Sequence, residues 1–340
     1  MKAMVLCAGL GTRLRPFTER WPKPALPFLG QPLLRYHLSV LKRAGVTAVG
    51  INTHHLGETM RAVAESECAR AGLPLKVVHE EVLQGTGGGI RGLRHFLADD
   101  DFIVFNGDTL FPVELAPVVA AHRAAGAAAT MVLLPMPAGE KYSAVELDAE
   151  QRVQRVAGKG PGGEGLTPWH FSGVHVMSPR VFEFMSPSGA EDIVHDVYLR
   201  MMAAGHAVHG APVQAYWSDL GTPRRYLATQ LQVLSGVASL DAFGADSPFL
   251  DLAPSGARVF TRPGAEPGHA RVVGPAFLDQ GVQLAHSARV GPGVSLGARV
   301  RVGEGAQIRR SAVFEDTEIA PEEELEDVLA WGAHRISAAR

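Results

Sequence analysis

Short apolar segments alternate with longer amphipathic segments over residues 1–235 of the chain. The short segments are typical of buried strands, and Leu34, Leu38 and Leu41 mark the apolar face of a helix. The pattern predicts strands at 2–7, 46–51, 75–79, 102–105, 128–134, 170–177 and 213–217, a hairpin of 143–147 with 153–156, and helices at 31–44, 57–70, 88–97, 113–125, 191–204 and 223–234. Such alternation predicts an α/β fold with a mostly parallel sheet, in which ligands bind beyond the carboxyl ends of the strands.

The last part of the chain repeats with a period of six. An aliphatic row consists of Val272, Leu278, Leu284, Val290, Leu296, Val302 and Ile308, and a row of smaller residues consists of Val282, Ala288, Val294, Val300, Ala306 and Ala312. A hexapeptide period is typical of a β-helix, in which each short strand places an aliphatic side chain in a shared core. The segment before the repeat has no period and is rich in Gly, Pro, Ser and Asp. We therefore expect a first domain at 1–235, a connector at 236–270 and a β-helix at 271–335.

Composition excludes several functional classes. The formal net charge of −3 gives no basic surface for nucleic acid or an anionic membrane. The best candidate for a membrane span, 113–135, is interrupted by His122 and Arg123. Two cysteines, Cys7 and Cys68, do not make a disulfide framework. We therefore expect a cytoplasmic protein that binds neither nucleic acid nor membrane.

The first residues carry the strongest chemical signal. An apolar strand runs into a loop with Gly9 and Gly11, Arg13 follows, and Lys23 lies between two prolines. Glycines let a polyphosphate approach the backbone, and arginine and lysine neutralise its charge. The dinucleotide-binding pattern would need a third glycine where Leu14 stands, and the P-loop pattern is absent.

Two aspartates and a glycine-rich segment follow predicted strands. Asp108 follows the strand 102–105, and Asp219 precedes the helix 223–234. Two such carboxylates can converge on one Mg²⁺, which takes its other ligands from water and phosphate, although an aspartate at such a position is also a common cap or turn residue. The segment 84–89 is either a loose turn that opens a helix or a surface that contacts a flat base through its backbone.

These segments together resemble the sugar-1-phosphate nucleotidylyltransferases, the nucleotide-sugar pyrophosphorylases. The family's opening pattern is L-A-G-G-x-G-T-R-L-x-P-x-T followed by P-K-P, and it corresponds here to Leu6-Cys7-Ala8-Gly9-Leu10-Gly11-Thr12-Arg13-Leu14-Arg15-Pro16-Phe17-Thr18 and Pro22-Lys23-Pro24. The family's N-G-D and W-x-D-x-G-T-P motifs are intact at 106–108 and 217–223. The resemblance implies a Rossmann-like, mostly parallel sheet of the nucleotide-diphospho-sugar transferase type, followed by a short left-handed β-helix.

The resemblance also implies a role for individual residues. Arg13 would polarise the leaving pyrophosphate, Lys23 would stabilise the α-phosphate and the attacking oxygen, and Asp108 and Asp219 would hold Mg²⁺. The implied nucleotide-binding residues are Leu6, Ala8, Gly9, Gly11, Thr12, Gln84, Gly85, Thr86, Gly88 and Asp108. The implied sugar-binding residues are Asn106, Tyr142, Lys159, Ser172 and Gly173, although the segment around Lys159 lacks the Glu and Pro of the family.

The implied reaction makes a nucleoside-diphosphate sugar and pyrophosphate from a nucleoside triphosphate and a sugar 1-phosphate. The triple glycine is similar to the version in N-acetylmuramate-1-phosphate uridylyltransferases and in heptose- or mannose-1-phosphate guanylyltransferases. We favour GTP with a mannose- or heptose-type 1-phosphate, and the alternative is a uridylyltransferase for an N-acetylated sugar such as N-acetylmuramate 1-phosphate. A regulatory subunit that only binds nucleotide sugars is an alternative of another class, and acyl transfer by the β-helix would need more than roughly two to three coils. We expect a homo-oligomer.

Overall fold

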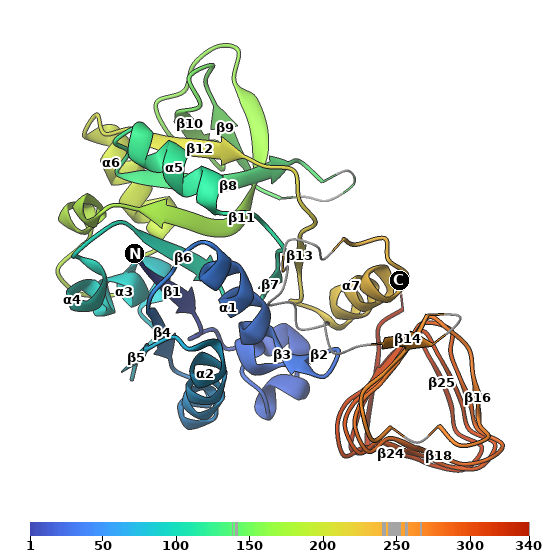
Figure 1. The fold of residues 1–340 in the computed structure, drawn as a ribbon. Helices are drawn as coiled ribbons and strands as arrows, with labels where there is room; N and C mark the ends of the chain where they lie inside the picture. Colours follow the sequence, from blue (N-terminus) through green and yellow to red (C-terminus); the bar gives the residue numbers. More distant parts are fainter. Residues whose placement is uncertain are drawn as a thin grey trace.

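The computed structural model describes residues 1–137, 139, 142–239, 243, 253–255, 258–265 and 267–339. These residues form an α/β part and a β-helix that lies beside it (Figure 1). The division of the chain at 235 and 270 stays a prediction, and much of the predicted connector lies outside the described residues. No helix formed by the described residues is long and apolar enough to cross a membrane.

The α/β part is built on a sheet to which the described residues contribute nine strands. Its strands are β1 (Lys2–Leu6), β4 (Val49–Thr53), β5 (Leu75–His79), β6 (Phe102–Asn106), β8 (Ala129–Pro135), β9 (Ala144–Leu147), β10 (Val153–Val156), β11 (Thr167–Met177) and β12 (Val208–Pro212). The order is β10-β9-β11-β6-β1-β4-β5, and β8 joins β11 to β12. Strands β6, β1, β4 and β5 are mutually parallel, so their carboxyl ends meet at one edge of the sheet.

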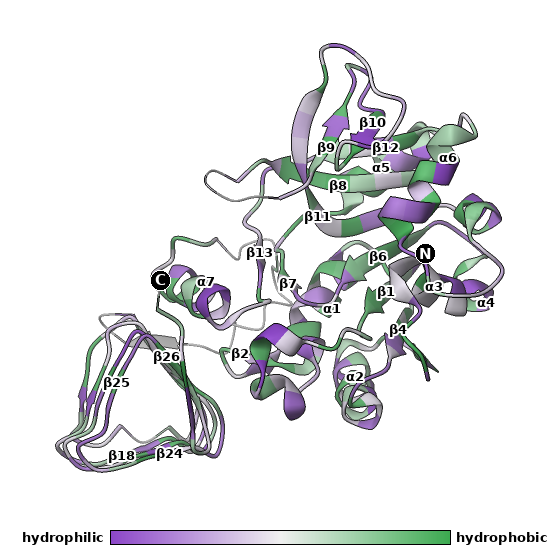
Figure 2. Ribbon diagram, turned by 180° about the vertical axis from the view of Figure 1, so that it is seen from behind, coloured by the Kyte–Doolittle hydropathy of each residue, from purple (hydrophilic) through white to green (hydrophobic). Residues whose placement is uncertain are grey.

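Helices cover both faces of this sheet. They are α1 (Leu33–Arg43), α2 (Gly57–Ala71), α3 (Gly85–Gly92), α4 (Arg94–Leu97), α5 (Ala116–Ala124), α6 (Leu199–Ala203) and α7 (Pro223–Leu234). The alternation along β1 separates two cores, because Ala3 and Val5 pack with α1 and α2 whereas Met4 packs with α3 and α4. Figure 2 shows the hydrophobic residues along β1, β6 and β8, as expected for strands buried on both faces. The short strands are β2 (Pro27–Phe28), β3 (Gln31–Pro32), β7 (Thr109–Leu110) and β13 (Ser218–Asp219).

Several predicted elements differ from the structure. The strand expected at 213–217 is wrong: β12 ends at Pro212, and Val213 makes one last backbone bond to Leu133 O at 2.8 Å. The apolar side chains of 213–217 pack against the core, although their backbone does not continue the strand hydrogen bonds of β12. Their apolar pattern therefore resembles that of a strand. The helix expected at 191–204 begins as a π-helix, Ile193–Tyr198, and the helix expected at 88–97 begins three residues earlier and is divided at Leu93.

The β-helix has three faces, each a stack of short strands (Figure 1). The first face holds β14 (Ala253–Ser255), β15 (Val259–Thr261), β17 (Ala276–Leu278), β20 (Val294–Leu296), β23 (Ser311–Val313), β26 (Val328–Trp331) and β27 (His334–Ser337). The second holds β16 (Arg271–Val272), β19 (Arg289–Val290), β22 (Gln307–Arg309) and β25 (Glu324–Glu326), and the third holds β18 (Gln283–Leu284), β21 (Arg301–Val302) and β24 (Glu318–Ile319). Strand β15 pairs in parallel with β17, although it lies within the predicted connector.

The hexapeptide row explains this architecture. Val272 pairs with Val290, and Val290 pairs with Ile308, because three units of six make one coil. Ile308 then pairs with Leu325, a step one residue shorter, so the sequence period ends while the β-helix continues. The buried core of the β-helix includes both predicted rows except Val272, Leu284 and Ala312. Val272 and Leu284 pack at its margin, and Ala312 joins the core of the α/β part.

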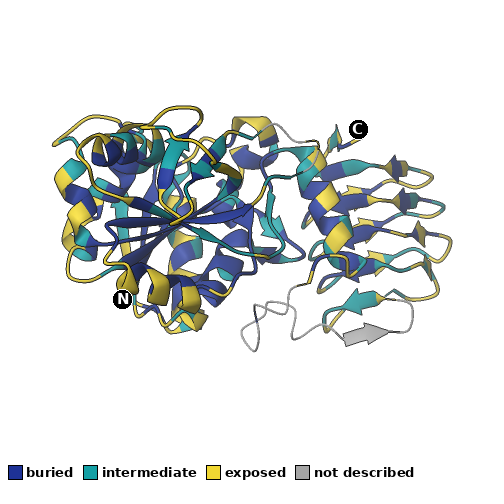
Figure 3. Ribbon diagram, turned by 90° about the horizontal axis from the view of Figure 1, so that it is seen from above, coloured by how far each residue is buried: buried dark blue, intermediate teal, exposed yellow. Residues whose placement is uncertain are grey.

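Aromatic residues join the β-helix to the α/β part. Phe314 lies 4.8 Å from the ring of Phe17 and 5.5 Å from those of Trp21 and Tyr226. The buried side chain of Gln230 on α7 accepts a 2.6 Å hydrogen bond from Ser295 Oγ. In Figure 3 the buried sides of the coils face α7, and the exposed turns point away from the α/β part.

Candidate active site

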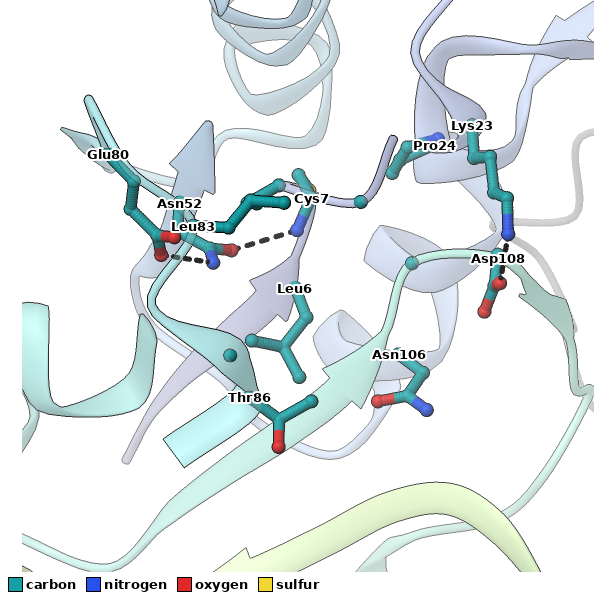
Figure 4. Close-up of a pocket in the computed structure, with 14 residues that line it drawn as sticks. Leu6, Cys7, Lys23, Pro24, Asn52, Glu80, Leu83, Thr86, Asn106 and Asp108 are labelled. Carbon is teal, nitrogen blue, oxygen red and sulfur yellow. Dashed lines mark hydrogen bonds and ion pairs between the residues drawn. The ribbon is translucent and has the colours of Figure 1, made fainter. Parts of the chain in front are cut away.

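A cavity of about 250 Å³ lies at the sheet edge where β1, β4, β5 and β6 end (Figure 4). It is lined by Leu6, Cys7, Ala8, Gly9, Lys23, Pro24, Asn52, Glu80, Leu83, Gly85, Thr86, Asn106, Gly107 and Asp108. Segments far apart in sequence meet here because parallel strands place their following loops on one side. The cavity is therefore where the prediction for an α/β sheet places a ligand.

A chain of buried hydrogen bonds closes one end of the cavity. Asn52 Nδ2 donates to Glu80 Oε1 at 2.8 Å, and Asn52 Oδ1 accepts from Cys7 N at 2.8 Å. Glu80 Oε2 accepts from Gln84 N at 2.9 Å. Helix α3 can approach this pair because residue 89 is glycine: a Cβ there would lie 2.6 Å from Asn52 Nδ2. The result is a fixed carboxylate, 6% exposed, at the wall of the cavity.

A cation and a carboxylate face each other at the other end (Figure 4). Lys23 Nζ lies 2.9 Å from Asp108 Oδ2, and both side chains line the cavity. Lys23 begins a 3₁₀ turn, Lys23–Ala25, that follows the extended Pro22. Gly107 lets the chain after β6 approach both β1 and this turn, because a Cβ there would lie 2.5 Å from Leu6 O and 2.7 Å from Pro24 Cγ. One end of the cavity therefore carries a hydrogen-bonded carboxylate, and the other carries the ion pair of Lys23 with Asp108.

The second predicted carboxylate lies beside the first. Strand β13 pairs with β7 so that Asp219 is opposite Thr109, and Leu220 N donates to Asp108 O at 2.9 Å. Arg225 Nη1 donates to Asp219 Oδ2, and Asp219 Oδ1 is buried with no hydrogen-bond partner in the described part of the chain. The two predicted metal-ligating aspartates thus lie side by side, Asp108 in the turn before β7 and Asp219 on β13, and each faces a cation.

These carboxylates fit a magnesium ion that is shared with a substrate. No group of three or more His, Cys, Asp or Glu side chains within the described ranges is arranged to hold a metal alone. Mg²⁺ needs only one or two protein carboxylates when phosphate and water complete its shell. The unpartnered oxygen of Asp219 and the cations on both aspartates indicate a site with capacity for positive charge.

Arg13 reaches the same region from the first loop. Gly11 has φ +64°, and a Cβ there would lie 2.7 Å from Thr18 Cγ2, so the turn requires glycine. Arg13 is exposed, and its guanidinium passes Gly221 so closely that a Cβ on Gly221 would lie 2.9 Å from Nη2. The glycine of the second-aspartate motif therefore makes room for the predicted pyrophosphate-binding arginine.

The predicted sugar-binding residues do not all converge. Asn106 lines the cavity, and Gly173, with φ +85°, leaves room for its side chain, since a Cβ at Gly173 would lie 2.7 Å from Asn106 Nδ2. Ser172 is buried and its hydroxyl donates to Val132 O, which is a structural bond within the sheet. Lys159 is exposed in a turn that pairs through its backbone with Val156, and no side-chain contact to the site is found for it among the described residues.

Tyr142 belongs to an aromatic cluster near Asp219. Its ring centroid lies 4.2 Å from that of His170 and 5.7 Å from that of Trp217. Burial lowers the pKa of His170 to about 4, so the ring is neutral at pH 7. Trp217 Nε1 donates to Ser172 O at 2.8 Å, which ties the cluster to β11. The ring of Tyr142 is therefore held in place by its contacts with His170 and Trp217.

The predicted nucleotide-binding residues divide into two groups. Leu6, Ala8, Gly9, Gly85, Thr86 and Asp108 line the cavity, whereas Gly11, Thr12, Gln84 and Gly88 do not. The N–H groups of Gly87 and Gly88 donate to Glu191 O at 2.9 and 3.3 Å, so they are engaged within the protein. The glycines of α3 thus allow close packing on Glu191 and on the Asn52–Glu80 pair.

The sequence analysis did not identify Glu80 or Arg225 as candidate site residues. Glu80 follows the strand 75–79 directly, as Asp108 follows 102–105, so an acidic residue at a strand end was an available signal. Arg225 lies inside a predicted helix, and its pairing with Asp219 depends on how the turn before α7 is placed. No sequence pattern indicates that contact.

Comparisons with known proteins agree with this geometry. The family model described as nucleotidyl transferase matches residues 2–236. A mannose-1-phosphate guanylyltransferase from Mycobacterium tuberculosis is 31% identical over 92% of this chain and 82% of its own length. A UTP–glucose-1-phosphate uridylyltransferase from Synechocystis is 26% identical over 99% of this chain and 88% of its own, and a glucose-1-phosphate thymidylyltransferase from Streptomyces griseus is 28% identical over 100% and 94%.

A solved structure supports the fold alone. It is a putative glucose-1-phosphate thymidylyltransferase from Bacillus anthracis, 20% identical, with a TM-score of 0.55 over 65% of this chain and 90% of that chain. The segment that the family model matches includes the sheet and the cavity described above. It also includes Arg13, Lys23, Asp108 and Asp219. The chain therefore belongs to the nucleotidyl transferase family of enzymes.

Proposed function

We propose that this enzyme makes a nucleoside-diphosphate sugar and pyrophosphate from a nucleoside triphosphate and a sugar 1-phosphate, with Mg²⁺. The observation that carries the proposal is the meeting of Lys23, Asp108, Asp219 and Arg13 at one end of the cavity. The two cations and the two carboxylates at this end suit the phosphates of a triphosphate and a divalent ion, and the other end of the cavity leaves room for the base. A non-catalytic subunit is disfavoured because all four residues are present and close together.

The reaction requires positioning and charge neutralisation rather than a covalent enzyme intermediate. A phosphate oxygen of the sugar 1-phosphate attacks the α-phosphorus in line, the bond from that phosphorus to the bridging oxygen breaks, and pyrophosphate leaves with the electron pair. Lys23 stabilises the charge at the α-phosphate, and Arg13 binds the departing pyrophosphate. Asp108 and Asp219 hold Mg²⁺, which supplies neutralisation of the phosphate oxygens when bound.

The fixed carboxylate of Glu80 supports GTP as the substrate. Each Glu80 oxygen accepts one hydrogen bond from the protein and keeps capacity for a second. Guanine presents two adjacent donors, N1–H and the N2 amino group, which suit a carboxylate. Uracil and thymine present one N–H between two carbonyl oxygens, and those oxygens would repel it. Leu6 and Leu83, which line the same cavity, offer apolar contacts to a flat base.

The sugar is proposed to be a mannose- or heptose-type 1-phosphate. The 31% identity to a mannose-1-phosphate guanylyltransferase over most of both chains supports this choice. A uridylyltransferase is the second candidate, because the match to a UTP–glucose-1-phosphate uridylyltransferase spans 99% of the chain. For that alternative we would expect an N-acetylated sugar such as N-acetylmuramate 1-phosphate. We further propose a homo-oligomer, which sedimentation of the full chain would test.

The test is a matrix of GTP, UTP, dTTP, ATP and CTP against sugar 1-phosphates, with pyrophosphate release as the readout at saturating Mg²⁺. We expect the highest kcat/KM for GTP with mannose 1-phosphate or a heptose 1-phosphate. Glu80→Gln should reduce the preference for GTP over UTP by about tenfold, because an amide retains one acceptor and adds a donor. The matched control is Glu81→Gln on the neighbouring exposed residue. A higher kcat/KM for UTP in the unaltered chain would favour the second candidate.

A further inference from the structure

The ion pair between Arg225 and Asp219 has a place in the site but no role in the mechanism above. Asp219 Oδ2 accepts from Arg225 Nη1, while the other carboxylate oxygen is buried and has no hydrogen-bond partner in the described part of the chain. The side chain of Arg225 is 28% exposed and that of Asp219 is 18% exposed. The carboxylate proposed to hold a divalent ion is therefore held by a guanidinium at the rim of the site.

A second surface binds the same guanidinium. Arg225 Cζ lies 5.2 Å from the centroid of the Tyr142 ring, which is within the range of a cation–π contact. Tyr142 is held by the aromatic cluster, in which His170 and Trp217 lie 4.4 Å apart. The backbone of Arg225 is fixed in the first turn of α7, where its N–H donates to Thr222 Oγ1 at 3.3 Å. The side chain can thus leave Asp219 without leaving the site.

We propose that Arg225 binds the phosphate group of the sugar 1-phosphate, and that it is held on Asp219 until a divalent cation occupies that carboxylate. The proposal rests on the proposed function and extends it to the second substrate. With a divalent ion on Asp219, the guanidinium of Arg225 would no longer be needed as the counter-charge and would be repelled at short range. The released fork, still over Tyr142, matches the geometry of a phosphate and can bind two of its oxygens.

The same arrangement occurs at the other aspartate, where Lys23 Nζ lies 2.9 Å from Asp108. One divalent ion shared by Asp108 and Asp219 would therefore free two cations at once, a lysine and an arginine. The two reacting phosphates meet between them in the proposed reaction. It follows that the metal prepares the phosphate site before the sugar 1-phosphate binds.

The first arm of the test measures metal binding without substrates. Mn²⁺ binding to the full chain is followed by electron paramagnetic resonance for wild type, Arg225→Gln and Arg225→Lys. Arg225→Gln should bind Mn²⁺ about tenfold more tightly, because the competing cation is gone, and Arg225→Lys should lie between. Arg224→Gln is the matched control, since Arg224 is exposed on the same helix turn and the charge change is identical. An unchanged Mn²⁺ affinity in Arg225→Gln would overturn the proposal.

The second arm measures phosphate binding at saturating Mg²⁺. Calorimetry with inorganic phosphate, and KM for the sugar 1-phosphate, should both show about tenfold weaker binding in Arg225→Gln, with partial recovery in Arg225→Lys and no change in KM for the triphosphate. Equal weakening for both substrates would make Arg225 a structural residue and refute its assignment. If no pair of nucleotide and sugar 1-phosphate turned over, the proposed function would be wrong. The Mn²⁺ and inorganic phosphate titrations would still decide whether Arg225 competes with the metal and binds phosphate.

Discussion

The edge of the sheet and the β-helix are built in opposite ways. In the β-helix, Val290 meets Val272 and Ile308 because one coil contains three units of six residues, and the contacts are apolar. At the sheet edge, Lys23 meets Asp108 across 85 residues of sequence, and the contact is ionic and partly exposed. One region is therefore defined by a repeated pattern and the other by where unrelated loops end.

This difference separates stability from chemistry. A buried aliphatic residue in the β-helix contributes packing energy and has no charge with which to act on a phosphate. A partly exposed ion pair contributes little to stability, typically up to about 1 kcal/mol, yet it can determine how a phosphate binds. Substitutions at the sheet edge should change turnover and leave folding intact, and substitutions in the β-helix core should do the reverse.

The largest expected effect is at the proposed metal carboxylates. Asp108→Asn and Asp219→Asn should each lower kcat about a thousandfold, which corresponds to about 4 kcal/mol, because each removes a negative charge that faces Mg²⁺. Pyrophosphate release at saturating Mg²⁺ measures the loss, and thermal unfolding should stay within about 2 °C of wild type. Near-normal turnover in either variant would remove that aspartate from the metal site. Asp316→Asn, an exposed aspartate on the β-helix paired with Arg299, is the control.

The next largest effect is expected in acid, which should destabilise the α/β part more than the β-helix. Burial lowers the pKa of His37 to about 4 and that of His175 to about 3, so each is neutral in the folded chain. Because the unfolded chain takes up these protons at a pKa of about 6.5, the free energy of unfolding is unaffected above that pH and decreases as the pH falls below it. At pH 5.5 each histidine should lower the free energy of unfolding by about 1.4 kcal/mol. The histidines of the β-helix, His269, His286 and His334, are exposed.

Hydrogen exchange at pH 7.5 and pH 5.5 would measure this separation. Peptides from β6 and β11 should lose protection in acid before those from β19 to β22. His175→Gln should reduce the pH dependence, and His286→Gln should leave it unchanged. Equal loss of protection in both regions would contradict the separation.

Lys23→Ala tests whether the ammonium group of Lys23, which lies beside Asp108 in the cavity, stabilises the transition state. We expect kcat to fall about thirtyfold, or about 2 kcal/mol, with a smaller rise in KM for the triphosphate. Steady-state kinetics with the best substrate pair would show it. If KM alone changed, Lys23 would bind the triphosphate without assisting the reaction.

The smallest expected effect lies in the β-helix core. Val300→Ala removes buried methyl groups from a side chain with 0% exposure and should cost about 1.5 kcal/mol of unfolding free energy. Chemical denaturation would measure the loss, and kcat and KM should not change. Val273→Ala, on the surface, is the control. A fall in kcat in Val300→Ala would show that packing in the β-helix core affects the active site, which would contradict the separation of the two regions.

The same contrast explains what the sequence could predict. The strand at 75–79 and the helix at 223–234 were predicted at their observed limits, and the six-residue rows predicted the β-helix faces, because these depend on local periodicity. The strand at 213–217 failed because apolar alternation does not reveal whether a partner strand is present. The aliphatic row of the sequence ends at Ile308 because a single shorter step breaks the period there.

The site was predictable only in part, for a related reason. The residues at the ends of strands, such as Asp108, follow from the sheet rule, and the resemblance supplied the roles of Arg13, Lys23 and Asp219. Glu80 and Arg225 are held by partners fixed by tertiary structure, an asparagine on β4 and an aspartate before α7. Contacts of that kind are absent from any local pattern.

The contact of Phe314 with Phe17 and Trp21 makes the unit of folding larger than the segment that the family model matches. The family match ends at residue 236, yet the segment between Arg13 and Lys23 is packed against a ring of the β-helix. A chain ended there would present Phe17, Trp21 and Tyr226 to water beside the loop that carries Arg13. The segment that the family model matches is thus no portable module in this protein, and exchange of its β-helix for another would have to reproduce an aromatic residue at position 314.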